Sequence, residues 1–258
     1  MPKPTIDIPL DEAEEKARPA QEQKASRIDI PLDEDGKRAE PLDITMAELE
    51  FVNRHHEEYK APRAGTGGPL MQYILQTPLS KADLAPLQAG DTVLLSGVVY
   101  TARDAAHARM MELLDQGKPL PFPIEGAAIY YVGPTPERPG CAIGAAGPTT
   151  SGRMDAYTPR LLDLGLACMI GKGKRSEAVK QSVVQNGAVY LAAIGGAGAL
   201  MANSVQSCEV IAWPDLGCEA VRRLVVRDFP LTVLLDAHGG DLYQSGPAAY
   251  LAARENRT

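Results

Sequence analysis

Aromatic residues and long apolar runs are both scarce in this sequence. Phe, Trp and Tyr account for 5% of the 258 residues, and no apolar run approaches the roughly 20 residues that a membrane-spanning helix needs. The N-terminus also lacks the apolar centre of a secretory signal. These absences argue against a membrane protein and against export, so we expect a cytoplasmic protein with no membrane contact.

Cysteine is scarce too, and no two cysteines are close together. Cys141, Cys168, Cys208 and Cys218 form no C-x-x-C pair. Zinc and iron–sulfur sites usually draw their ligands from such close pairs. We therefore expect reduced thiols, with Cys168 in a buried strand, and no metal site in this chain.

A basic surface is not expected either. The formal net charge is −7, and residues 1–66 account for most of it, with 10 Lys+Arg against 16 Asp+Glu. The remaining residues are nearly neutral, with 16 against 17. Nothing in this balance favours nucleic acid as a partner.

The first 44 residues have the composition of a disordered acidic tail, because charges are frequent and large apolar side chains are few. The tail contains the sequence I-D-I-P-L-D-E twice, at residues 6–12 and 28–34. An alternative interpretation is therefore a docking peptide that the chain presents in two copies.

Residues 45–70 are expected to form a short helix and a linker. Thr45 and Glu48 make a capping box, and the Gly- and Pro-rich residues that follow the helix are typical of a linker. His55 and His56 lie on the predicted helix, but adjacent helical positions diverge. A solvated face therefore explains them better than a metal site does.

From residue 71 to 245 strand-like and helical segments alternate. This alternation predicts an α/β or β/β/α domain, followed by a C-terminal tail at 246–258 that is a peripheral helix or a frayed end. The expected strands are residues 91–100, 127–132, 166–170, 188–194, 208–213, 221–227 and 231–236.

The most distinctive segment begins with a Gly-rich loop at residues 144–152, whose composition exposes backbone amides and hydroxyls. Arg153 follows the loop, and the next predicted strand leads to Lys172 between two glycines. Because ligands of α/β proteins gather where strands end, we expect Thr149, Arg153 and Lys172 at one mouth. An ordinary Gly-rich turn is the alternative.

A third cation, Arg103, lies between a predicted strand and a helix that Asp104 is expected to cap. Arginine grips a carboxylate or phosphate through two hydrogen bonds, and lysine adds a point charge. The set suits a small dianion such as a dicarboxylate. Each cation considered alone is better explained as a surface charge, but the position of all three at Gly-rich or capped junctions favours a shared site.

Nucleotide motifs are incomplete. The sequence Gly171-Lys172-Gly173-Lys174 lacks the remainder of a P-loop, and residues 195–200 lack the last glycine of G-x-G-x-x-G. For residues 195–200 we favour tight backbone packing at the start of a helix.

No base is obvious. His107 is better explained as a structural hydrogen bonder than as a catalyst. Thr149 and Ser151 could act only if the nearby cations lowered their pKa, and Asp104 and Asp155 could hold the arginines in place. The residues alone thus indicate a small-anion site with incomplete catalytic equipment.

Four motifs nevertheless occur together and in order. They resemble the β-type domain of class I iron–sulfur fumarases and tartrate dehydratases over residues 71–245. The motifs are T-A-R-D-A-A-H (101–107), P-F-P-I-E-G-A-A-I-Y-Y-V-G-P (121–134), G-P-T-T-S-G-R-M-D-A-Y (147–157) and I-G-K-G (170–173).

The resemblance implies a swivelling β/β/α-type domain that lies over a partner α subunit. In the family, three cysteines of the α part hold a [4Fe-4S] cluster, and the four cysteines of this chain do not match those ligands. By the same resemblance Arg103, Arg153 and Lys172 bind the substrate carboxylates, and Thr149 is the base that removes a proton from C3 of malate. Asp104, His107, Thr150, Ser151 and Asp155 would support them.

The expected function is therefore the β subunit of a hetero-oligomeric hydro-lyase that interconverts (S)-malate and fumarate. One alternative is the same chemistry on tartrate or another hydroxy-diacid. An alternative of another class is a non-catalytic binding or assembly module.

Overall fold

The computed structural model describes residues 70–255. The expected tail, the short helix with His55 and His56, and most of the linker lie outside these residues. The strands are β1 (Gln72–Gln76), β2 (Thr92–Thr101), β3 (Ala128–Tyr130), β4 (Cys168–Gly171), β5 (Val189–Ala192), β6 (Val205–Ala212) and β7 (Val221–Leu235). The helices are α2 (Lys81–Leu84), α3 (Asp104–Asp115), α4 (Thr158–Asp163), α5 (Glu177–Asn186), α6 (Gly198–Asn203) and α7 (Leu242–Glu255), with 3-10 turns η1 (Ser151–Met154) and η2 (Pro214–Glu219).

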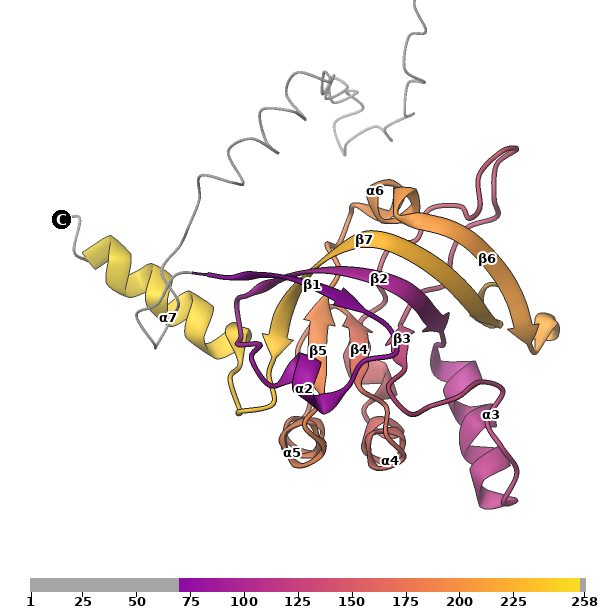
Figure 1. The fold of residues 1–258 in the computed structure, drawn as a ribbon, viewed down its shortest axis with the longest axis horizontal. Helices are drawn as coiled ribbons and strands as arrows, with labels where there is room; N and C mark the ends of the chain where they lie inside the picture. The colour runs from indigo at the N-terminus through magenta and orange to yellow at the C-terminus, as the bar shows by residue number, and fades with distance from the viewer. Residues whose placement is uncertain (1–69, 256–258) are drawn as a thin grey trace, which may run out of the picture. The chain divides into compact units, whose positions relative to one another are not determined.

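The sheet folds back on itself through one long strand. Strands β1 to β5 are parallel neighbours in chain order. Strand β7 runs antiparallel and pairs with β2 along one edge and with β5 and β6 along the other. Figure 1 shows β2, β6 and β7 above the short strands β3 to β5, with α4 and α5 below. The mixed α/β prediction is confirmed, and the layers are sheet, sheet and helix.

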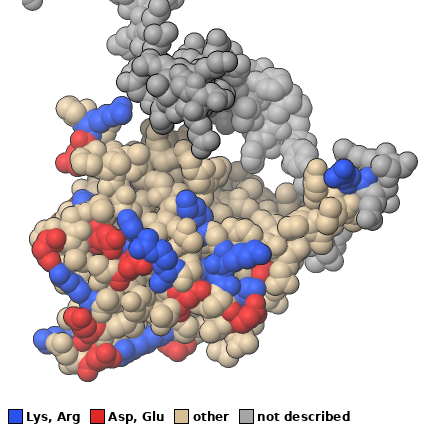
Figure 2. Space-filling view, turned by 180° about the vertical axis from the view of Figure 1, so that it is seen from behind, with Lys and Arg blue, Asp and Glu red and all other residues tan. Residues whose placement is uncertain are grey.

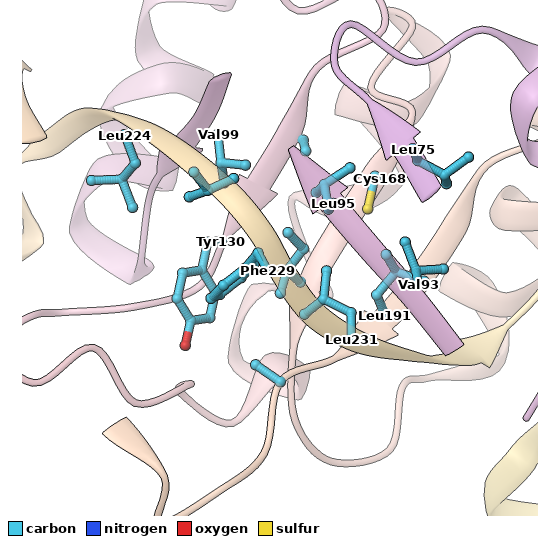
Figure 3. Packing of buried hydrophobic residues seen from close by; sticks show 14 of the residues in the cluster. Leu75, Val93, Leu95, Val99, Tyr130, Cys168, Leu191, Leu224, Phe229 and Leu231 are labelled. Atoms are coloured by element: carbon cyan, nitrogen blue, oxygen red, sulfur yellow. The ribbon is translucent and has the colours of Figure 1, made fainter. Parts of the chain in front are cut away.

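One apolar core fills the space between the two sheet layers. Leu95, Tyr130, Leu191 and Phe229 are at most 1% exposed and come from four different strands (Figure 3). Burying a side chain of this size stabilises the fold by about 1.5–3 kcal/mol. A second core lies between the parallel strands and the helices, so β3, β4 and β5 are buried on both faces, as parallel strands usually are.

Helix boundaries follow local sequence signals. The Ser176 hydroxyl accepts a hydrogen bond from the Val179 amide at the start of α5, and Gly187 ends that helix with a φ of 64°. A serine cap at the start and a glycine with positive φ after the last turn are common signals of helix ends. The C-terminal segment is helical over α7, as one of the two sequence alternatives had it, but the helix begins at Leu242 and runs across the expected boundary at residue 246.

One expectation about the strands is wrong. The two strands predicted at 221–227 and 231–236 are a single strand, β7. Between them the chain makes a bulge at Asp228, which has a φ of 48° and donates its amide hydrogen to Ser96 Oγ at 3.0 Å. A bulge bends a strand without ending it.

The surface shows mixed charge. On the face in Figure 2, Lys and Arg side chains are interspersed with Asp and Glu. Among residues 70–255, no helix combines the length and apolar character that crossing a membrane requires.

Candidate functional site

The predicted site residues follow the carboxyl ends of parallel strands. Arg103 comes two residues after β2 ends, and Lys172 directly follows β4. The loop after β5 brings Gly195 against the Lys172 side chain, with 4.0 Å between the Cβ position of Gly195 and Nζ. Carboxyl ends of parallel strands lie at the same edge of a sheet, so these loops share one rim.

Residues 148–151 are inserted between the ends of β3 and β4. The Thr149 amide donates to the Tyr131 carbonyl at 2.7 Å, and the Ser151 amide donates to the Lys172 carbonyl at 2.8 Å. Thr150 and Lys172 are bridge partners. The structure therefore places Thr149 and Lys172, two of the three residues expected at one mouth, on the same rim, with Thr150 beside Lys172.

Arg103 is held in place by a residue that the sequence did not indicate. Its Nη2 lies 3.2 Å from Glu219 Oε1, and Glu219 Oε2 accepts the Ala105 amide at 3.1 Å. The guanidinium also lies against Gly133, where a Cβ atom would collide with Nη1. Glu219 comes from η2, distant in sequence, and no local pattern marks it.

The expected capping role of Asp104 is wrong. Arg103 is the N-cap of α3 and makes no side-chain capping bond; the Glu219 carboxylate takes an amide of the first turn instead. Asp104 pairs with Arg153, accepting from Nε at 2.9 Å and approaching Nη2 at 2.7 Å. The alternative that Asp104 holds an arginine is the one the structure supports. The pair orients Arg153, whose side chain stays 51% exposed.

The Gly-rich segment at 195–200 packs backbone against backbone, as predicted. A Cβ atom on Gly198 would lie 3.0 Å from the Gly147 amide nitrogen, and the Ala146 amide donates to the Gly198 carbonyl at 2.9 Å. This close contact fixes the loop before Thr149 against the start of α6.

His107 is a buried structural residue. Its ring is fully buried, stacks near Tyr157 and meets Tyr131 edge-on. Nδ1 lies 2.8 Å from the Arg103 carbonyl, so Nδ1 carries the hydrogen. Burial lowers the pKa of His107 to about 4, against the opposing effect of that carbonyl. The imidazole is therefore neutral at pH 7.

This burial predicts a pH dependence of stability. Unfolded His107 takes up a proton as the pH falls below 6.5, whereas folded His107 stays neutral down to about pH 4. The stabilisation is thus complete above pH 6.5 and decreases by about 3 kcal/mol as the pH falls to 4. Denaturant unfolding of the wild type and of His107→Gln at several pH values measures it. We expect the free energy of unfolding to depend less steeply on pH in the variant. Parallel plots of this free energy against pH for the two proteins would contradict a buried, neutral His107.

A buried arginine that no sequence pattern indicates lies beneath the rim. The Arg175 side chain is 0% exposed, and its Nε donates to Asp155 Oδ1 at 2.6 Å. Nη2 donates to Thr158 Oγ1 at 2.7 Å. The guanidinium carbon lies 4.9 Å from the Tyr190 ring centre and 5.5 Å from that of Tyr131. The partners come from several elements, so no sequence pattern reveals the cluster. The sequence suggested Asp155 as a partner of Arg103 or Arg153, whereas the structure pairs it with Arg175.

The thiols do not converge. Cys168 is buried between the sheet layers, whereas Cys141 and Cys218 are exposed. Within residues 70–255 no three His, Cys, Asp or Glu side chains are grouped so that they could hold a metal ion. The cysteines of the described chain therefore do not fit the ligand set of an iron–sulfur cluster.

Comparison with known proteins gives consistent matches. The family model described as Fumarase C-terminus matches residues 46–246. Fumarate hydratase class I, anaerobic, of Escherichia coli (strain K12) is 38% identical over 181 residues, covering 69% of this chain and 33% of that protein. Fumarate hydratase 2 of Leishmania major is 39% identical over 173 residues, or 66% of this chain and 30% of that protein.

A relative of different length also matches. The putative L(+)-tartrate dehydratase subunit beta of Methanocaldococcus jannaschii is 38% identical over 180 residues, covering 67% of this chain and 92% of that protein. The chain thus spans about a third of the two fumarate hydratases but nearly all of the separate β subunit.

Proposed function

Because this chain belongs to the fumarase C-terminus family, we propose that it is the β subunit of an iron–sulfur hydro-lyase that interconverts (S)-malate and fumarate. Its substrate is a small dicarboxylate, and its partner is an α subunit. The match to nearly the full length of a β subunit supports a two-chain enzyme. The β/β/α domain would swivel over the α subunit to close the site.

The observation that carries the proposal is the set of cations on one rim. Arg103 and Arg153 are oriented by Glu219 and Asp104, while Lys172 makes no ion pair with any residue in the described part of the chain. A dicarboxylate needs cationic partners at both ends, and arginine forks provide directional ones. We assign Arg103, Arg153 and Lys172 to the substrate carboxylates.

Thr149 is the proposed proton acceptor. In the dehydration direction the alkoxide form of Thr149 would take the C3 proton of malate, and the C3–H electron pair would form the double bond of fumarate. The C2 hydroxyl would leave as hydroxide, for which the cluster of the family would supply a Lewis acid. The neighbouring positive charges of Arg153 and Lys172 would stabilise a threonine alkoxide. The [4Fe-4S] cluster of the family would be held by the α subunit, since the thiols of this chain do not fit it.

The function is tested by absorbance at 240 nm with malate, on this chain alone and on the chain co-expressed anaerobically with an α-type subunit. Activity in the pair only is the expected result. Activity with tartrate but not malate would favour the alternative substrate, which the tartrate dehydratase match motivates. If the assembled pair is inactive on every hydroxy-diacid, the remaining interpretation is that the chain is a binding or assembly module.

The tight contact at Gly133 gives a specific prediction for this enzyme. In Gly133→Ala the new methyl group falls on the flexible end of Arg103, so the arginine should move while the fold stays intact. We expect kcat/KM of the assembled enzyme to fall by about 10- to 100-fold, with an unchanged thermal midpoint. Gly246→Ala is the control, because its Cβ meets Leu242 at an ordinary 3.6 Å. Equal activity in both variants would contradict the placement of Arg103.

A further inference from the structure

A continuous chain of hydrogen bonds lies beneath the rim. The Tyr190 hydroxyl is 2.9 Å from the Gly173 carbonyl and 2.8 Å from Ser151 Oγ. A carbonyl only accepts, so the Tyr190 hydrogen goes to Gly173 and the Ser151 hydroxyl donates to Tyr190. Ser151 Oγ in turn accepts the Lys172 amide at 3.1 Å. One phenol on β5 therefore connects the start of η1 to the turn after β4.

A second connection lies at the other end of η1. Asp155 directly follows η1 and accepts from Arg175 Nε through Oδ1 and from the Ser176 amide through Oδ2, each at 2.6 Å. Arg175 is itself packed against the Tyr131 and Tyr190 rings. Because the guanidinium is fully buried, its position is set by these neighbours and not by solvent.

The two connections enclose the residues that carry the site's charges. Segment η1 bears Arg153, and the residues from 172 to 176 begin with Lys172. Ser151 binds Lys172 at one end of η1, and Asp155 binds Arg175 at the other. Two short segments fastened at both ends keep a fixed separation between their exposed side chains.

We propose that Tyr190, Arg175 and Asp155 are positioning residues that fix Lys172 relative to Arg153 and so set the spacing of two carboxylate-binding cations. The specificity part of this proposal rests on the proposed function. The positioning part concerns this chain alone and can be measured without activity.

Tyr190→Phe tests the proposal, and Tyr131→Phe is its matched control. Both variants keep a buried ring against Arg175. The Tyr131 hydroxyl, however, lies 3.4 Å from Thr158 Oγ1, and in the described part of the chain it makes no hydrogen bond to Ser151 or Gly173, the two partners of Tyr190. We measure amide hydrogen exchange of peptides covering residues 150–174 in the full chain. Exchange at Ser151 and Lys172 should become about tenfold faster in Tyr190→Phe and stay unchanged in Tyr131→Phe.

Kinetics of the assembled enzyme give the second readout. A disturbed spacing should raise KM for the dicarboxylate by about tenfold and change kcat less, whereas a purely structural role would lower the amount of folded enzyme without changing KM. Ser151→Ala removes the same connection and replaces Tyr190→Phe if that variant does not fold.

Exchange at residues 150–174 that is the same in Tyr190→Phe and Tyr131→Phe would overturn the positioning role. If Tyr190→Phe shows faster amide exchange but an unchanged KM, the link to substrate specificity is overturned. A wild-type pair that is inactive on all hydroxy-diacids would instead refute the proposed function, and the exchange data would still decide on positioning.

Discussion

Arg153→Ala is expected to lower kcat/KM of the assembled enzyme by about 100- to 1000-fold, because it removes a directional partner of a substrate carboxylate. Folding should be unaffected. The Arg153 side chain is 51% exposed and paired with Asp104, and such exposed pairs contribute about 0–1 kcal/mol to stability. The measurements are steady-state kinetics with malate and fumarate, and thermal unfolding of the isolated chain.

Arg160→Ala is the matched control for this variant. Arg160 lies on α4, is 45% exposed and pairs with Asp115, so its replacement removes an equivalent surface ion pair away from the rim. It should leave kcat/KM unchanged. An Arg153→Ala enzyme that retains most of its activity after assembly would exclude Arg153 from the carboxylate site.

Arg175→Met should lower the free energy of unfolding by about 3–5 kcal/mol, since it leaves the partner carboxylate of a buried ion pair uncompensated. The Asp155 side chain is only 16% exposed and would lose its 2.6 Å contact. Burial alone would lower the pKa of Arg175, yet contacts with Tyr131 and Asp155 raise it, so the wild-type group stays charged. Denaturant titration of the full chain measures the change.

The double variant Arg175→Met with Asp155→Asn isolates the interaction. The double variant should lose less free energy of unfolding than the two single variants lose together, because no unpaired charge remains. Arg109→Met serves as the surface control, since Arg109 pairs with the 61% exposed Asp215. If Arg175→Met lowers the free energy of unfolding no more than Arg109→Met does, the buried pair contributes little to stability.

The sequence predicts where Arg103 and Lys172 lie because both follow strand ends. The short apolar run of β4 predicts a buried strand. Lys172 is therefore expected just after the end of that strand. The Ser176 cap likewise fixes the start of α5. Local signals of this kind depend on neighbours within a few residues, and the structure confirms them.

Contacts between distant segments could not be predicted in the same way. Asp104 has the right residue type for a cap, but tertiary contacts override this preference: Glu219 supplies the bond to the first turn and Asp104 turns to Arg153. Arg175 looks like an exposed basic residue after Lys174, and only the folded sheet places two tyrosine rings and a carboxylate around it. The continuity of β7 through Asp228 depends on its pairing with β2.

The position of β7 after β2 to β6 in chain order has a consequence for biosynthesis. Residues 92–100 of β2 pair with residues 223–232, so a chain emerging from the ribosome must complete β3 to β6 before this edge of β2 is covered. Until then β2 exposes unpaired backbone groups that can recruit another strand. We expect nascent chains that end before residue 221 to aggregate or bind chaperones, and productive folding to begin only when β7 is released.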